Sequence, residues 1–563
     1  MCSLCPLWLP FLSSFFLFFV VNDHLIIGNR LMKNVELIVR MLERAGVRWV
    51  FGVPSGPVLP LIEALRESAV QFVLTASETS AGFMASAVGY LTGVPGVCVS
   101  TVGPGATNLT TGVGSAWLDR APVLAITCNV ASPWLERRIQ MRIDHNALFR
   151  PLTKATFSLR HGRVGERLAE ALALATQEPP GPVHLDLPED SAVADAKEFA
   201  GSAQAAVTLP NLSSELAQSV SSALEKASRP LVITGLTFTR SAAAQVLLQF
   251  IERQSMPFVT TLHAKGFLPE SHANFAGVIG RARRTDVKAF LDRADLIIAV
   301  GFDPIEINYE EWVKRGVSII HVSTEAAETG EGLSFLWNKA CDFDRAVAAL
   351  GMLSPVENHW TSNEFAHHRQ AFERALRPAC DGFAAQEALD VLRAKLPADA
   401  ILAYDVGAHT HQIASQWRTD VPKTLLATNG WSSMGYGMPA AFAAKLVSPE
   451  RNVACIVGDG GFRMTAGELA LARRLNLAVP TIVLNDGWLG LMKVKQERRN
   501  YPLSGVFLGE PPESPPHYFG VPCRPAKTPD EFRSALDWAI AHNGPSVIEA
   551  FIDVASYAQT VFD

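Results

Sequence analysis

This sequence has few cysteines and no large excess of charge of either sign. These two absences exclude several kinds of protein. Only 8 of the 563 residues are cysteines, and Cys2 and Cys5 form the one CxxC spacing. With no second pair to complete a zinc site, we expect neither zinc nor a disulfide framework, and a reducing compartment such as the cytoplasm. The 49 Lys and Arg nearly balance the 55 Asp and Glu, so no nucleic acid is expected as a partner.

A long apolar run is also missing, with one short exception at the amino terminus. Leu7 to Val21 is apolar apart from Pro10 and two serines, about five residues shorter than a membrane-spanning helix requires. No basic residue precedes it and no small-x-small cleavage site follows, so a secretory signal is not indicated. We expect residues 1–33 to be an apolar extension outside the fold, with Met32 as the natural initiator. A membrane anchor is the alternative.

The remaining chain is organised in three blocks in which strand-like apolar runs alternate with helical patterns. Its length, at about 150 residues per domain, allows three or four domains. We expect domains over residues 34–195, 205–350 and 380–563. The alternation predicts an α/β fold in which each domain is a doubly wound parallel sheet. The expected strands include Trp49–Gly52, Gln71–Thr75, Val97–Thr101, Val123–Thr127, Asp295–Gly301, Val317–Ser323, Ala400–Tyr404, Val453–Val457 and Pro480–Leu484.

One strand-loop-helix-strand unit of the third block carries most of the functional information. Its first strand stops at Gly458-Asp459-Gly460-Gly461, and its second strand ends at Asn485-Asp486-Gly487. A right-handed crossover brings Asp459 and Asn485 to the same edge of adjacent parallel strands. A carboxylate, an amide oxygen and a backbone carbonyl are hard ligands suited to Mg²⁺ that also holds a diphosphate, and the glycines let backbone amides approach phosphate oxygens. An ordinary capped turn is the alternative.

Gly458-Asp459-Gly460 together with Asn485 resembles the signature of thiamine-diphosphate-dependent enzymes. The resemblance to the acetolactate synthase and 2-oxoacid decarboxylase group extends from about residue 34 to the end. It implies a pyrimidine-binding domain, a central domain and a diphosphate-binding domain, with thiamine diphosphate and Mg²⁺ as cofactors. By that resemblance Asp459, Asn485 and the carbonyl of Gly487 would ligate Mg²⁺.

The family needs a carboxylate beside the aminopyrimidine ring of thiamine, and Glu78 stands at the matching place. Glu78 follows an expected strand and opens a helix. The segment Gly103-Pro104-Gly105-Ala106-Thr107-Asn108 then resembles the family's next motif. A first-turn residue that favours the helix dipole is the alternative role for Glu78. In the family this glutamate reaches cofactor held by another subunit, which implies a homo-oligomer, a dimer or commonly a tetramer, with active sites at the subunit interface.

Two further segments resemble parts of the family that contact the cofactor. Ser432-Ser433-Met434-Gly435 matches the segment whose bulky apolar residue supports thiamine in a bent conformation. Met434 would take that role, and the backbone of Ser432 and Met434 would hydrogen-bond the pyrimidine; plain core packing is the alternative. Asp405-Val406-Gly407-Ala408-His409 resembles the loop that reaches the diphosphate, which makes His409 a candidate phosphate contact.

The identity of the reaction depends partly on histidines that the sequence lacks. Several decarboxylases of this family place active-site histidines before the Gly-Pro-Gly motif, whereas residues 51–143 contain none, which favours carbon-carbon bond formation. Gly301-Phe302-Asp303-Pro304-Ile305-Glu306 resembles catabolic acetolactate synthases, which lack FAD, so FAD is not expected. We predict Glu78-assisted activation of the thiazolium, attack on a 2-oxoacid such as pyruvate, loss of CO₂ and addition to a second carbonyl compound.

The substrate contacts are the least specific part of this prediction. Asn108, Met141, Arg142 and Lys154 are the candidates, with Met141 at a position where the synthases usually carry Gln. Arg138, Arg142, His145 and Lys154 would bind a substrate carboxylate; for the two arginines a solvated basic face is the alternative. Three other functions stay open: a non-ligating 2-oxoacid decarboxylase or related carbon-carbon lyase, an FAD-dependent oxidase of related architecture, and a catalytically silent scaffold subunit that binds thiamine diphosphate.

Overall fold

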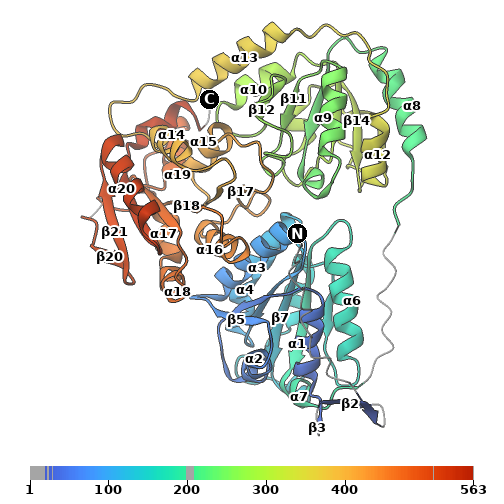
Figure 1. Ribbon diagram of the computed structural model, residues 1–563, viewed down its shortest axis with the longest axis vertical. Coiled ribbons are helices and arrows are strands. Elements are labelled where there is room, and N and C mark those ends of the chain that lie inside the picture. The colour runs from blue at the N-terminus through green and yellow to red at the C-terminus, as the bar shows by residue number, and fades with distance from the viewer. Residues whose placement is uncertain (1–18, 22–23, 28–29, 198–207, 511–512, 562–563) are drawn as a thin grey trace, which may run out of the picture.

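Three parallel α/β sheets, one per domain, form the frame of the molecule. The computed structural model describes residues 19–21, 24–27, 30–197, 208–510 and 513–561. Two of the three large sheets have six strands and the third has seven. Figure 1 shows the first domain in blue and cyan, the central domain in green and yellow, and the third in orange and red. The prediction of three parallel-sheet domains is confirmed.

The first domain has the strand order β5-β4-β6-β7-β9-β8, so its topological switch point lies between β4 and β6. Helices cover both faces, which is why β6, β7 and β9 are buried along their whole lengths. The strands are β4 Trp49–Gly52, β5 Gln71–Leu74, β6 Gly96–Ser100, β7 Val123–Asn129, β8 Thr156–Ser158 and β9 Pro182–Pro188. The helices are α1 Asn34–Arg44, α2 Leu59–Arg66, α3 Glu78–Thr92, α4 Pro104–Leu118, α5 His145–Phe149, α6 Val164–Thr176 and α7 Glu189–Val193.

The central domain has the order β12-β11-β10-β13-β14-β15, with its switch point between β10 and β13. The strands are β10 Pro230–Thr234, β11 Phe258–Thr260, β12 Phe275–Val278, β13 Leu296–Val300, β14 Ser318–Ser323 and β15 Ser334–Ala340. The helices are α8 Ser213–Leu224, α9 Ala244–Arg253, α10 Arg284–Leu291, α11 Tyr309–Trp312 and α12 Phe343–Leu350, and α13 Ser362–Ala375 leads to the third domain. This domain has two hydrophobic clusters of its own.

The third domain has the order β17-β16-β18-β19-β22-β21-β20, with its switch point between β16 and β18. Its neighbouring strands are parallel except for the β20–β21 pair. The strands are β16 Ile401–Tyr404, β17 Leu425–Leu426, β18 Val453–Gly458, β19 Pro480–Asn485, β20 His517–Tyr518, β21 Val521–Ala526 and β22 Ser546–Phe551. The helices are α14 Ala385–Lys395, α15 Ala408–Gln416, α16 Gly437–Val447, α17 Asp459–Thr465, α18 Glu468–Arg474, α19 Gly490–Arg498 and α20 Pro529–Ala541.

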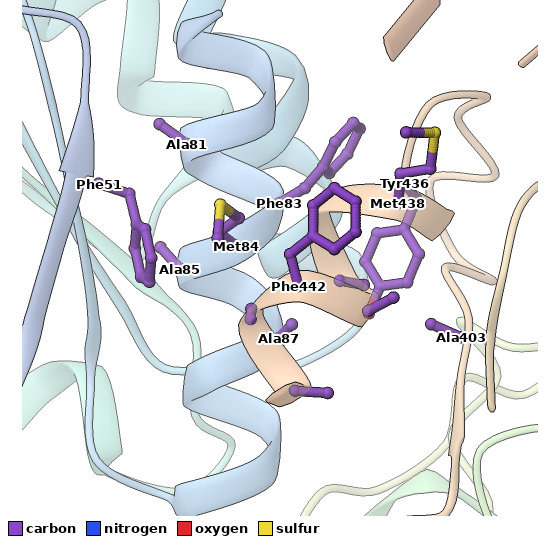
Figure 2. Packing of buried hydrophobic residues seen from close by; sticks show 14 of the residues in the cluster. Phe51, Ala81, Phe83, Met84, Ala85, Ala87, Ala403, Tyr436, Met438 and Phe442 are labelled. Carbon is purple, nitrogen blue, oxygen red and sulfur yellow. The ribbon is translucent and has the colours of Figure 1, made fainter. Parts of the chain in front are cut away.

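The first and third domains share one hydrophobic core, built around the contact between α3 and α16. Figure 2 shows the two helices side by side, with Phe83 of α3 facing Tyr436 and Phe442. The rings of Phe83 and Tyr436 meet edge to face, with centroids 5.6 Å apart. On its other side α3 meets α4 backbone to backbone, because a Cβ at Gly82 would come within 2.8 Å of the Cα of Gly112. The helix that begins at Glu78 is therefore fixed on both sides.

The described part of the amino-terminal extension forms a small antiparallel sheet of its own, with β1 Phe19–Val21, β2 His24–Ile27 and β3 Arg30–Leu31. Met32 is fully buried in the first domain, and Lys33 Nζ pairs with Asp195 at 2.7 Å, so these two residues of the predicted extension pack on that domain. Most of the predicted apolar run lies outside the described residues. Within the described ranges, no helix has the length and apolar character needed to cross a membrane.

Candidate active site

The carboxyl ends of β16, β18 and β19 gather the predicted cofactor-binding residues of the third domain. Gly458 at the end of β18 pairs in register with Leu484 of β19. Asp459 and Asn485 each come one residue later, so they stand next to each other at the edge of the sheet. His409, near the start of α15, follows β16 on the other side of β18. This set therefore lies at the switch point, where doubly wound sheets bind their ligands.

Two of these side chains have oxygen atoms that their surroundings leave unpaired. Asp459 Oδ2 and Asn485 Oδ1 are buried and have no hydrogen-bond partner among the described residues. The other oxygen of Asp459 accepts the N–H of Gly460 at 2.9 Å, and Asn485 Nδ2 donates to Glu549 at 2.7 Å. Because buried polar atoms are almost always paired, two neighbouring unpaired oxygens indicate a missing ligand. A carboxylate and an amide oxygen fit a hard cation such as Mg²⁺.

Burial also acts on the carboxylates at this edge. Loss of hydration raises the pKa of Asp459 to about 6 and that of Asp486 to about 7, and a bound divalent cation would compensate such desolvated charge. The carbonyl of Gly487, the third predicted ligand, accepts the N–H of Leu508 at 2.8 Å. A carbonyl oxygen has two lone pairs, so this bond leaves one of them for a cation.

The ring of His409 lies against the start of the Gly-Asp-Gly turn. A Cβ at Gly458 would come within 3.1 Å of His409 Cε1, and one at Gly407 within 2.6 Å of the same atom, so both glycines make room for the ring. Burial lowers the pKa of His409 to about 4, which keeps the ring neutral at pH 7. Its Nε2 atom is buried without a hydrogen-bond partner in the described part of the chain. A ring nitrogen in this position fits a contact with a diphosphate.

Met434 reaches the same turn from the loop before α16. Its methyl carbon lies 3.1 Å from the position that a Cβ at Gly460 would occupy, so the structure brings Met434 to the Gly-Asp-Gly turn. Ser432, in the same loop, has a positive φ of 51°, and its hydroxyl donates to the carbonyl of Asn429 at 2.6 Å. The side chain of Ser432 thus holds the loop, while its backbone is the part that was predicted to meet the pyrimidine.

Asp405 has a role that sequence reasoning missed. Its buried carboxylate accepts the N–H groups of Gly435 at 2.8 Å and Tyr436 at 3.1 Å, and so holds the loop that carries Met434. A Cβ at Gly461 would come within 2.0 Å of Asp405 Oδ2, which explains the second glycine after Asp459. The signal in the sequence was an acidic residue directly after the buried strand β16.

The pyrimidine half of the predicted site lies in the first domain, where Glu78 is the first residue of α3. Glu78 is 9% exposed, and its Oε2 accepts a hydrogen bond from Asn108 Nδ2 at 3.2 Å. Gly105, at the start of α4, leaves space beside the other oxygen, because a Cβ there would come within 3.1 Å of Glu78 Oε1. The Gly-Pro-Gly turn and Asn108 therefore surround the glutamate directly.

The predicted substrate contacts fall into two groups, one near Glu78 and one away from it. Met141 and Arg142 lie near the Gly-Pro-Gly turn, since a Cβ at Gly103 would come within 2.3 Å of the carbonyl oxygen of Met141. Met141 is 46% exposed, and Arg142 Nε is buried with no hydrogen-bond partner in the described ranges. These two residues and Asn108 are thus grouped with Glu78.

Lys154 and His145 are placed differently from what the sequence predicts. Lys154 Nζ donates to the carbonyls of Gln177 at 2.6 Å and Pro179 at 2.7 Å, and its backbone pairs with the start of β9. It therefore lies at the amino edge of the sheet, opposite to Glu78, and its amine is occupied. His145 is fully buried, with Nδ1 2.9 Å from Thr127 Oγ1, and its Nε2 accepts the N–H of Gly103; it supports the turn from inside.

At the switch point of the central sheet an acidic side chain is bonded by the chain itself. The buried carboxylate of Glu306 accepts the N–H of Leu236, just after β10, at 2.8 Å, and lies 3.0 Å from His263 Nδ1. The ends of β10 and β13 also press together, because a Cβ at Gly235 would come within 2.5 Å of the Cα of Phe302. Burial works against the charge of His263, but Glu306 and Asp119 outweigh it and raise its pKa.

Comparison with known proteins matches all three domains to one family. Residues 32–148 match the thiamine pyrophosphate enzyme N-terminal TPP binding domain, residues 217–335 the central domain, and residues 405–550 the C-terminal TPP binding domain. Together with relatives that share 30% or more of their residues with most of the chain, these matches show that the chain belongs to the thiamine pyrophosphate enzyme family.

The relatives narrow the class further. The chain is 31% identical to a probable acetolactate synthase large subunit of Methanocaldococcus jannaschii, over 93% of this chain and 92% of that one. It is 30% identical to the acetolactate synthase isozyme 1 large subunit of Escherichia coli, over 92% and 94%, and 29% identical to an acetolactate synthase of Bacillus subtilis, over 93% and 94%. The chain is therefore a thiamine-pyrophosphate-dependent enzyme of the acetolactate-synthase-like kind.

Proposed function

We propose that this enzyme uses thiamine diphosphate and Mg²⁺ to decarboxylate a 2-oxoacid such as pyruvate and to join the remaining fragment to a second carbonyl compound. The observation that carries the proposal is the pair of unpaired, buried oxygens of Asp459 and Asn485, which lies with His409 and Met434 at one switch point. Relatives whose printed names state acetolactate synthase, matched over nearly the whole chain, support the choice of reaction.

The third domain would hold the cofactor by its diphosphate. Asp459 Oδ2, Asn485 Oδ1 and the carbonyl of Gly487 would bind Mg²⁺, which in turn would hold the diphosphate oxygens. His409 Nε2 would meet the diphosphate beside Gly458, and Met434 would support the rings from the loop that Asp405 fixes. Bound thiamine diphosphate supplies a nucleophilic carbon and accepts the electron pair that is released when CO₂ leaves a 2-oxoacid.

The first domain would supply the proton chemistry. Glu78 would hold a proton against a ring nitrogen of the aminopyrimidine, and Asn108 orients its carboxylate by donating to Oε2. Of the predicted substrate contacts, Arg142 is the cation placed to bind a substrate carboxylate, with Met141 and Asn108 beside it. Lys154 has no part in this proposal because its amine is bound elsewhere.

The active site would be completed by a second copy of the chain. We propose a homo-oligomer in which Glu78 of one protomer serves the diphosphate half of its partner, the arrangement that the family resemblance implies. The cysteines support a reducing compartment such as the cytoplasm, since Cys98, Cys128, Cys341, Cys380, Cys455 and Cys523 are all free.

The deciding experiment is product analysis with pyruvate, thiamine diphosphate and Mg²⁺. We expect acetolactate. Acetaldehyde without acetolactate would replace the proposal with a non-ligating decarboxylase, and failure to bind thiamine diphosphate in calorimetry would replace it with a silent subunit. Glu78→Gln should lower kcat by about 10²- to 10⁴-fold, the usual contribution of one acid-base group, while the cofactor still binds.

Mixing two inactive variants tests the shared site. Glu78→Gln and Asp459→Asn each damage one half, so a mixed dimer has one intact site and one site with both defects. Random exchange of subunits should restore about a quarter of wild-type activity, since half of the dimers are mixed and each has one working site. No recovery after verified exchange would mean that both halves come from the same protomer.

A further inference from the structure

Glu549 is an acidic residue in the middle of a buried strand. It lies in β22, is 4% exposed, and belongs to the run Ser546-Val547-Ile548-Glu549-Ala550-Phe551. Side chains alternate along a strand, so Glu549 shares its face of the sheet with Val547, which is fully buried in the core of the first and third domains. A carboxylate on such a face lowers stability unless it is hydrogen-bonded, so its partners show why it is there.

Each oxygen of Glu549 has one side-chain partner. Asn485 Nδ2 donates to Oε1 at 2.7 Å, and the hydroxyl of Tyr518, from the edge strand β20, donates to Oε2 at 3.3 Å. The first contact crosses from β22 to β19, where Asn485 pairs in register with Phe551. Because Glu549 stands two residues before Phe551, its side chain leaves the sheet on the same face as that of Asn485.

The hydrogen bond decides which end of the Asn485 amide faces the proposed cation. An amide has a donor end and an acceptor end, and Asn485 turns its NH₂ group toward Glu549 because Nδ2 donates to Oε1. Its carbonyl oxygen then points away and is left buried without a partner in the described residues. We infer that Glu549 is a positioning residue that presents Asn485 Oδ1 to Mg²⁺. This inference rests on the proposed function, in which Asn485 binds Mg²⁺.

Two substitutions separate the orienting role from simple packing. Glu549→Gln keeps the size of the side chain, but its own NH₂ group allows a second pairing in which Asn485 is turned around and presents NH₂ to the cation. Glu549→Ala removes the anchor completely. Outer-shell partners of metal ligands typically contribute 10- to 100-fold in metal affinity, and we expect both variants to bind Mg²⁺ more weakly by a factor in that range.

The matched control is Tyr518→Phe. It removes the partner of the other Glu549 oxygen without touching Asn485, so we expect its Mg²⁺ affinity to stay within about twofold of wild type, well below an outer-shell effect. Mg²⁺ is titrated calorimetrically into the full-length protein with saturating thiamine diphosphate, and the thermal unfolding of the metal-free proteins is recorded by circular dichroism. A high Mg²⁺ concentration should restore thiamine diphosphate binding in Glu549→Gln.

The outcomes distinguish the inference from the function on which it rests. Wild-type affinity in a folded Glu549→Gln overturns the inference, as does an equal loss in Tyr518→Phe, and so does a loss that excess Mg²⁺ fails to reverse. Weaker, reversible binding in the Glu549 variants alone supports it. A wild-type protein that binds neither Mg²⁺ nor thiamine diphosphate overturns the proposed function instead.

Discussion

The switch points of the central and the third sheet are built from the same parts: two strand ends, a turn and a buried acidic residue. In the central domain the carboxylate of Glu306 accepts the N–H of Leu236 and also contacts the ring of His263. In the third domain Asp459 and Asn485 each keep one buried oxygen that no described residue bonds. The comparison teaches that the two edges differ in whether the chain itself bonds both oxygens of the acidic side chain at the strand end.

The largest effect should come from removing one of the unpaired oxygens. Asp459→Asn replaces a charged ligand by an amide and should weaken Mg²⁺-dependent binding of thiamine diphosphate by about a hundredfold or more, at least what the loss of an outer-shell partner costs. Asp303→Asn is the matched variant in the central domain, where Asp303 Oδ2 accepts Arg120 Nε at 2.9 Å. It should leave the affinity unchanged. Equal losses of affinity in the two variants, measured by calorimetry, would contradict the difference between the central and the third switch point.

Glu306, at the central switch point, should matter for the stability of the fold rather than for cofactor binding. Glu306→Gln breaks a buried charged contact and should lower the free energy of unfolding by about 3 kcal/mol. Glu325→Gln, a half-exposed partner of Arg120, is the control and should change it by less than about 1 kcal/mol. Urea unfolding of both variants measures the difference.

The Glu306 effect should also depend on pH. Glu306, Asp119 and Arg281 face His263, and its pKa is raised in the folded protein. A raised pKa stabilises the fold fully below the ordinary histidine value, about 6.5, and the contribution disappears as pH rises through the folded pKa. The deficit of Glu306→Gln should therefore be larger at about pH 6 than at about pH 9. A deficit that grows with pH would contradict the pairing of His263 with Glu306.

A smaller effect is expected at His409. His409→Ala removes one neutral polar contact, worth about 1 kcal/mol, and should weaken thiamine diphosphate binding about five- to tenfold. Since burial lowers the pKa of His409 to about 4, the loss should be similar at about pH 6 and about pH 8. Binding measured at both values checks this, and a loss confined to the acidic value would show that a protonated ring makes the contact.

The smallest expected effect is the change in thermal stability when FAD is added. Because Glu306 already occupies the N–H group at the central switch point, adding FAD should shift the thermal midpoint of the wild-type protein by less than about 1 °C, as expected when no ligand binds the folded state. The purified protein should also be colourless. A yellow protein, or a clear upward shift, would mean that this edge opens to a nucleotide.

The sequence predicts local features well and long-range contacts poorly. The three parallel sheets follow from apolar runs that match β4, β7, β13, β16 and β18 closely. The closeness of Asp459 to Asn485 follows from one crossover between consecutive strands. Glu549 and Glu306 could not be found this way, since their contacts depend on which distant strand or loop becomes a neighbour. Lys154 was misplaced because it comes just before β8, which runs parallel to β9, so it lies at the amino edge of the sheet.

The shared core of α3 and α16 has a consequence for how the chain unfolds. Residues of the first and third domains, far apart in sequence, bury one another in a single cluster, whereas the central domain has clusters of its own. Regions that share a core open as one cooperative unit. The first and third domains should therefore melt together, and neither should fold as an isolated fragment. A destabilising substitution at Phe83 or Tyr436 would then weaken both halves of the cofactor site at once.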